Sequence, residues 1–247
     1  MSLTALVIGN MLGAGVFTTT GFAMADLGSP GWVLLAWLVG GALALCGAVS
    51  YGALARLMPV SGGEYFFLSR VVHPLAGFIA GWVSLWAGFT AAIAFAAITF
   101  EAYLLPASLR AAIPENVVAT IAILLAALAH ALHVRRGARL QTAAVAVKLL
   151  LIGGFILFAI ARGDPGGWAG VQAWRDAPPT GFAPAAFATT LMWISFSYSG
   201  YNAAIYVASE AKQASAAVPR AILLGTAFTM VIYLALNAIF ALAPAPD

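Results

Sequence analysis

This chain of 247 residues contains seven continuous apolar stretches. Each is long enough to cross about 30 Å of hydrocarbon as a helix. Charged residues make up 8% of the sequence and hydrophobic residues 63%, so a soluble fold could not present the polar exterior that water requires. The stretches are continuous rather than alternating, which disfavours a transmembrane β-barrel. The sequence therefore predicts an all-α membrane protein with spans at 3–25, 31–56, 74–105, 117–133, 140–161, 183–209 and 218–243.

Basic residues between the spans predict the orientation, because cytoplasmic loops carry an excess of Lys and Arg. With the N-terminus inside, the inner loops would hold Arg56, Arg70, Arg135, Arg136, Arg139, Lys212 and Arg220. The outer loops would hold only Arg110, Arg162 and Arg175. We therefore expect an integral protein of a cytoplasmic (inner) membrane with its N-terminus inside. Both ends of the chain are abrupt, which indicates a portion of a longer protein.

The first span contains three glycines within seven residues, Gly9, Gly13 and Gly15. Each glycine weakens a helix by about 1 kcal/mol relative to Ala. A helix that opened at Gly13–Gly15 would free backbone N–H groups at the start of the next half-helix, where a carboxylate could bind. Gly13, Ala14 and Gly15 are therefore candidate substrate-binding residues. The alternative is close packing of this helix against another through its small residues.

Polar residues crowd the middle of the sixth span, which predicts a second discontinuous helix. The segment comprises Phe196, Ser197, Tyr198, Ser199 and Gly200, followed by Tyr201 and Asn202. Free carbonyls at this break could accept hydrogen bonds from an ammonium group. Breaks in corresponding positions of two halves point to the central site of a transporter. Hydrogen bonds between helices are the alternative explanation for the Ser and Tyr side chains.

Lys148 is the most unusual single residue in the apolar stretches. It follows Arg139 by nine positions, which places it about 13 Å deeper along a helix. An ionisable residue at such a depth is a candidate functional group by default. Its ammonium could exchange a proton or occupy the place of a bound Na⁺, so we predict a role in ion coupling. A lysine that extends its side chain to the interface is the alternative.

Tyr201 and Asn202, which follow the second break, are possible gate residues, and so are two acidic residues near span ends. Glu101 precedes Pro106 near the end of the third span, and Glu210 ends the sixth span beside Lys212. Each could instead be a charge at a helix end. The Pro- and Gly-rich stretch 59–65 interrupts the helices, and a short interfacial helix is expected after it.

Together these segments resemble the amino acid–polyamine–organocation (APC) family of permeases. The matching stretches are 8–17, 27–31, 59–65, 77–82, 141–150, 196–202 and 218–222, in the order and spacing of the family. The resemblance implies a single permease domain over 1–247 with a LeuT-like fold of two inverted five-helix repeats. Residues 1–162 would form the first repeat and 183–247 the start of the second, so the chain would be truncated to about seven helices, with helices 1 and 6 discontinuous.

The same resemblance implies roles for individual residues. Gly13, Ala14 and Gly15 would hold the substrate carboxylate, and the segment 196–199 would bind its amino group and shape the side-chain pocket. Lys148 matches the lysine that replaces a sodium ion and supports proton coupling in some relatives. Ala14 departs from the family, because many relatives have Ser or Thr there, and the site would rely more on backbone groups.

The predicted function is secondary active transport of an amino acid or related amine, by proton symport or exchange. A seven-helix receptor or retinal protein is the alternative, although a lysine in the fifth span rather than the last does not suit it. No H-E-x-x-H or G-x-S-x-G motif occurs, so we do not expect an enzyme. We expect no cofactor, metal or nucleic acid as a partner, but a small substrate, the lipid bilayer and protons.

Overall fold

The computed structural model describes residues 2–110, 112–132, 134–162 and 181–242, and every regular element in these ranges is helical. The predicted loop 163–181, with Arg175, lies almost entirely outside the described residues. The elements are α1 (Leu3–Met11), α2 (Gly15–Leu27), α3 (Pro30–Leu57), α4 (Gly63–Val71), α5 (Pro74–Val83), η1 (Ser84–Thr90), α6 (Ala91–Leu104), α7 (Ala107–Arg110), α8 (Val117–Leu132), α9 (Val134–Arg162), α11 (Pro184–Ser197), η2 (Tyr201–Glu210) and α12 (Ala214–Leu242).

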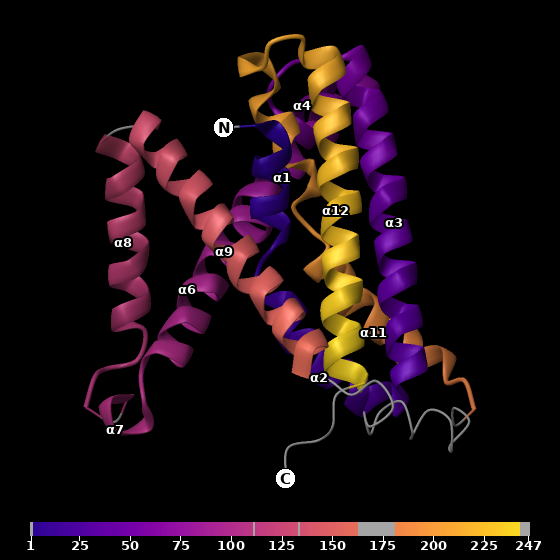
Figure 1. The fold of residues 1–247 in the computed structure, drawn as a ribbon. Helices are drawn as coiled ribbons and strands as arrows, with labels where there is room; N and C mark the ends of the chain where they lie inside the picture. The colour runs from indigo at the N-terminus through magenta and orange to yellow at the C-terminus, as the bar shows by residue number, and fades with distance from the viewer. Residues whose placement is uncertain (1, 111, 133, 163–180, 243–247) are drawn as a thin grey trace.

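The long helices α3 and α12 lie side by side and form the centre of a bundle with α1, α2, α11 and η2 (Figure 1). The rings of Trp37, Tyr198 and Tyr233 contact one another at the core of this bundle, with centroids 5.1 to 5.6 Å apart. All three side chains are almost completely buried. Small residues on α3 allow the close approach, because a Cβ on Gly41 would lie 2.9 Å from the Tyr198 hydroxyl oxygen.

Helices α6 and α8 pack against each other on one side of the bundle, and α9 crosses from α8 to contact α1 and α12 (Figure 1). Apolar side chains cover their outer faces: Leu124 on α8 is 62% exposed and Leu151 on α9 is 69% exposed. Such a surface suits hydrocarbon and not water. This side of the molecule therefore fits the predicted membrane environment.

The third predicted span is a continuous run from α5 through η1 to α6. Its middle segment, η1, is a π-helix, in which each N–H bonds to the carbonyl five residues earlier. The Thr90 hydroxyl also donates to the Leu85 carbonyl at 2.7 Å. A π-helical turn within a long α-helix is often found at a functional site.

Helices occupy all seven of the predicted spans within the described residues. Four of them, at 30–57, 74–104, 139–162 and 214–242, are long and apolar enough to cross a membrane, and α1 and α2 together would make a fifth. The other two predicted spans contain shorter helices, α8 and the pair α11 and η2. The count of seven spans and the LeuT-like arrangement stay predictions.

Both helix breaks lie where the glycines predict them. The axes of α1 and α2 are bent by 41° at residues 12–14. Helix α11 ends at Ser197, and the chain continues through Gly200, at φ +96°, into the 3₁₀-helix η2. The short helix expected after the stretch 59–65 is α4, which begins at Gly63.

Candidate functional site

The first break exposes the beginning of α2. The Gly13 N–H turns back to the Met11 carbonyl, with an N–O distance of 2.8 Å. The N–H groups of Ala14, Gly15 and Val16 donate to no acceptor within the residues that the structure describes. Unpaired N–H groups and the positive end of the helix dipole meet here, and such a helix start attracts anions.

The two breaks are packed against each other. A Cβ on Gly15 would lie 2.7 Å from the Ser197 hydroxyl oxygen, so only a glycine lets the first break approach the end of α11 this closely. A Cβ on Gly200 would lie 2.9 Å from the Asn10 carbonyl oxygen. Glycines from both breaks therefore lie in the contact between the two segments. Close helix packing through small residues, the alternative explanation for the glycines of the first span, thus occurs together with the opened backbone.

A hydroxyl group from α12 joins the two breaks. The Tyr233 hydroxyl hydrogen-bonds to the Met11 carbonyl at the end of α1, and it lies 3.1 Å from the Ser197 carbonyl at the end of α11. The Thr19 and Ser197 hydroxyls are also hydrogen-bonded, at 3.1 Å. These buried groups hold the two half-helix ends in one geometry, because a buried polar group without a partner is costly.

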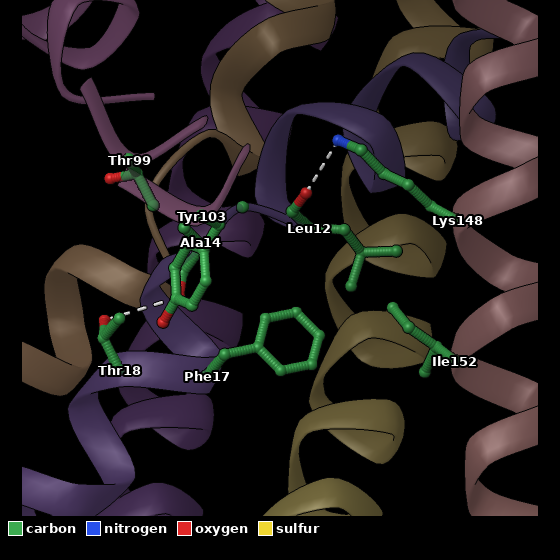
Figure 2. Close-up of a pocket in the computed structure, with 9 residues that line it drawn as sticks. Leu12, Ala14, Phe17, Thr18, Thr99, Tyr103, Lys148 and Ile152 are labelled. Carbon is green, nitrogen blue, oxygen red and sulfur yellow. Dashed lines mark hydrogen bonds between the residues drawn. The ribbon is translucent and has the colours of Figure 1, made fainter. Parts of the chain in front are cut away.

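Lys148 reaches the first break from α9. Its Nζ donates a hydrogen bond of 3.0 Å to the Leu12 carbonyl, immediately after the end of α1 (Figure 2). The carbonyl end of a helix carries the negative end of the helix dipole, which favours a cation. The lysine is therefore attached to the opened backbone and does not extend to an interface.

A cavity of about 490 Å³ opens at this break, between α2, α6 and α9 (Figure 2). The Thr18 hydroxyl on its wall hydrogen-bonds back to the carbonyls of Ala14 and Gly15. The volume suits a small organic molecule. The lining residues are Leu12, Gly13, Ala14, Phe17, Thr18, Thr99, Tyr103, Lys148 and Ile152.

The structure brings Gly13, Ala14 and Lys148 together in this cavity, whereas the predicted residues of the sixth span are not among those that line it. Tyr198 is buried behind the break, with its hydroxyl 3.2 Å from the Trp37 carbonyl oxygen. The Ser199 hydroxyl donates to the Phe196 carbonyl at 2.6 Å.

The possible gate residues occupy three different places. Tyr201 and Asn202 form the first turn of η2, and Glu210 is its exposed last residue. The Glu101 carboxylate accepts hydrogen bonds from the N–H groups of Asn116, at 2.9 Å, and Ala119, at 2.7 Å. It thus anchors the start of α8, and a gating role for Glu101 stays a prediction.

Six residues of the cavity wall were not predicted from the sequence: Leu12, Phe17, Thr18, Thr99, Tyr103 and Ile152. A signal existed for most of them. Positions three or four apart share one face of a helix. Thr18 is four residues from Ala14, Ile152 is four from Lys148, and Thr99 and Tyr103 are a polar pair four apart in an apolar span.

Comparison with known sequences identifies the family. The sequence model of the family described as "Amino acid permease" matches residues 1–247. The chain belongs to the amino acid permease family. The resemblance to the APC permeases is thereby confirmed, and the family consists of transporters and not of enzymes. A seven-helix receptor or retinal protein is not favoured.

Named relatives agree with this membership. The chain is 27% identical to the human (Homo sapiens) Large neutral amino acids transporter small subunit 2 over 256 residues, which cover 100% of this chain and 47% of the relative. It is 28% identical to the human Asc-type amino acid transporter 1, with coverage of 100% and 48%. It is 27% identical to the mouse (Mus musculus) b(0,+)-type amino acid transporter 1, with coverage of 94% and 48%. The chain therefore spans about half the length of the curated relatives it matches.

Proposed function

We propose that the complete protein carries a neutral amino acid, or a related amine, across a cytoplasmic membrane by secondary active transport. The observation that carries this proposal is the junction of the two helix breaks, with unpaired N–H groups at the start of α2 and a cavity that Gly13 and Ala14 line. The family supplies the reaction class, and the names of the relatives indicate amino acids as the substrates.

The substrate carboxylate would bind at the start of α2. Backbone N–H groups there, with the helix dipole, favour a negative charge without any cationic side chain. A site of this kind does not need a side-chain hydroxyl at Ala14. The amino group would face the segment 196–200, which contacts the first break through Gly15 and Ser197.

The lining of the cavity supports a neutral substrate side chain. Leu12, Phe17 and Ile152 are apolar, and Thr18, Thr99 and Tyr103 offer hydroxyl groups. No carboxylate is among the described residues that line the cavity, so a cationic side chain would lack a counter-charge there. Small and medium neutral amino acids fit this chemistry better than basic ones.

Lys148 would couple transport to protons. Its hydrogen bond to the Leu12 carbonyl ties its ammonium to the end of α1. Loss of the proton would remove the charge that favours this carbonyl end, which links the protonation state of Lys148 to the geometry of the break. Exchange of one amino acid for another remains compatible with the same site.

The architecture is part of the proposal. The chain would form a single permease domain, with 1–162 as the first repeat and 183–247 as the start of the second, in a LeuT-like fold. The excess of Arg and Lys in the predicted inner loops supports an N-terminus inside.

The test is uptake by the full-length protein in proteoliposomes. Radiolabelled neutral, acidic and basic amino acids are offered at two external pH values, with empty liposomes as the control. The proposal is supported if uptake of neutral amino acids is saturable and is inhibited by the same amino acid without the label. If proteoliposomes take up no more of any amino acid than liposomes without the protein, the proposal is wrong.

A further inference from the structure

The chain between α3 and α4 is hydrogen-bonded to the far end of η2. The Ser61 N–H donates to the Ser209 hydroxyl oxygen at 2.9 Å, and the Ser209 N–H donates to the Ser61 hydroxyl oxygen at 2.9 Å. The hydroxyl oxygen of each serine thus accepts a hydrogen bond from the backbone N–H of the other, which is 148 residues away in the sequence. Reciprocal bonds of this kind fix the register of the two segments, because neither can shift without the loss of both.

A carboxylate three residues later binds the start and the middle of η2. One oxygen of Glu64 accepts a hydrogen bond from the Asn202 side-chain amide, and the other accepts from the Tyr206 hydroxyl. Hydrogen bonds to an ionised acceptor are stronger than neutral ones. Gly63 has φ +56° and contacts the Tyr206 ring where a side chain would stand, so this glycine is needed for both the turn and the close approach.

We call these five residues the clasp: Ser61, Glu64, Asn202, Tyr206 and Ser209. They connect the loop after α3 and the first turn of α4 to the first turn, the middle and the end of η2. None of them lines the cavity at the first break.

Helix η2 needs such support. It consists of two short 3₁₀ pieces joined by a kink at Val207, where φ is −118° and ψ 20°. The hydrogen-bond geometry of 3₁₀ turns is poor, and the kink interrupts the bonds along the helix. One face, with Ala204, Ile205 and Ala208, is completely buried in the bundle. The other face is held by the clasp.

We infer that Ser61 and Glu64 are positioning residues that hold η2 in place and thereby set the geometry of the second helix break. Helix η2 begins directly after Gly200, which packs against the backbone of Asn10. A displacement of η2 would therefore move the contact between the two breaks. The functional part of this inference rests on the proposed transport activity.

A second cavity gives Tyr206 room to move. It measures about 220 Å³ and is lined by Tyr206, by Gly62 and Tyr65 beside the clasp, and by Ser84, Leu85 and Phe89 of η1, with Gly81. The rings of Phe89 and Tyr206 are 5.1 Å apart between centroids. The Tyr206 ring therefore borders open space beside η1, toward which it would turn when the bond to Glu64 is lost.

The first test measures hydrogen–deuterium exchange of the full-length protein in detergent. Glu64→Ala should raise the exchange rate of amides in 201–210 by about tenfold, since two hydrogen bonds to a charged acceptor are lost. Glu64→Gln should raise it less, because the amide oxygen still accepts a hydrogen bond. Glu115→Ala, which removes an exposed carboxylate from a loop, should leave it unchanged.

A milder pair of substitutions covers the case in which Glu64→Ala does not fold. Ser61→Ala and Ser209→Ala each remove one acceptor of the reciprocal pair and leave Glu64 intact. The double variant should raise exchange at the end of η2 while α3 exchanges as in the wild type. Unchanged exchange in 201–210 for both the Glu64 and the serine variants would overturn the clasp.

Transport measured on the same variants separates the clasp from the proposed function. Glu64→Ala should lower the turnover of uptake by about tenfold, because η2 would no longer hold the second break in one geometry, with most of the turnover recovered in Glu64→Gln. Faster exchange in a protein whose wild type transports nothing would support the clasp and refute the proposed function. Wild-type turnover in Glu64→Ala despite faster exchange would refute the positioning role and leave the proposed function standing.

Discussion

The Nζ of Lys148 on α9 donates a 3.0 Å hydrogen bond to the Leu12 carbonyl at the first helix break. This contact connects residues that are 136 positions apart. It also places the cation beside the residues that begin α2, in the wall of the cavity.

Replacement of Lys148 should alter the pH dependence of transport. In Lys148→Ala the Leu12 carbonyl loses its charged donor, and we expect slower uptake that varies less with external pH than that of the wild type. Uptake by the full-length protein across a series of external pH values measures this, with Lys212→Ala, an exposed lysine, as the control. A mutant that keeps the wild-type pH profile would show that Lys148 has no role in coupling.

Substitution of Gly15 should disrupt the junction of the two breaks. A Cβ there would lie 2.7 Å from the Ser197 hydroxyl oxygen, and overpacking costs about 1–3 kcal/mol. Gly15→Ala should lower substrate affinity by about tenfold, and Gly15→Val should abolish binding. Gly21→Ala on the same helix is the matched control, since nothing lies within 4 Å of its Cβ.

A compensating substitution sharpens this prediction. Ser197→Ala removes the closest atom to the new methyl group, so the double variant Gly15→Ala with Ser197→Ala should bind better than Gly15→Ala alone. If Gly15→Val takes up substrate at the wild-type rate, the site is not at this break.

Loss of the Tyr233 hydroxyl should destabilise the bundle. In Tyr233→Phe the Met11 and Ser197 carbonyls lose a buried partner, at a cost of about 1–3 kcal/mol. The thermal unfolding midpoint of the purified protein should therefore fall. Tyr65→Phe, at a tyrosine that is 51% exposed, should leave the midpoint in place; equal midpoints for both variants would contradict the bridging role.

Glu101 offers a test between a structural role and a gate. Its carboxylate holds the N–H groups of Asn116 and Ala119, so Glu101→Ala should increase hydrogen exchange in the first turn of α8 severalfold with little change in uptake. Glu115→Ala provides the comparison. Loss of uptake without faster exchange in α8 would favour the predicted gate.

Sequence reasoning located the helices and their interruptions well, for a local reason. Glycines at 13, 15 and 200 weaken the helix at the position they occupy, so their effect needs no tertiary information. The depth of Lys148 likewise follows from counting residues along one helix. These features depend on one segment at a time.

The contacts between segments were not accessible in the same way. Glu64 lies in a stretch that the sequence indicates only as a helix interruption, and its partners Asn202 and Tyr206 are more than a hundred residues away. The direction in which Glu101 points depends on the packing of α6 against α8. Which side chains line a cavity is decided by the faces that neighbouring helices present, and an apolar span carries little periodic signal to reveal them.

The winding of η2 has a consequence for distance along the chain. A kink at Val207 divides this helix, and the six residues before the kink, 201–206, would span about 12 Å as a 3₁₀-helix, at about 2.0 Å per residue, but only about 9 Å as an α-helix. Rewinding these six residues would exchange hydrogen bonds between residues three apart for bonds between residues four apart. It would also draw Gly200 about 3 Å closer to the kink, so the distance between the second break and Val207 depends on how this segment is wound.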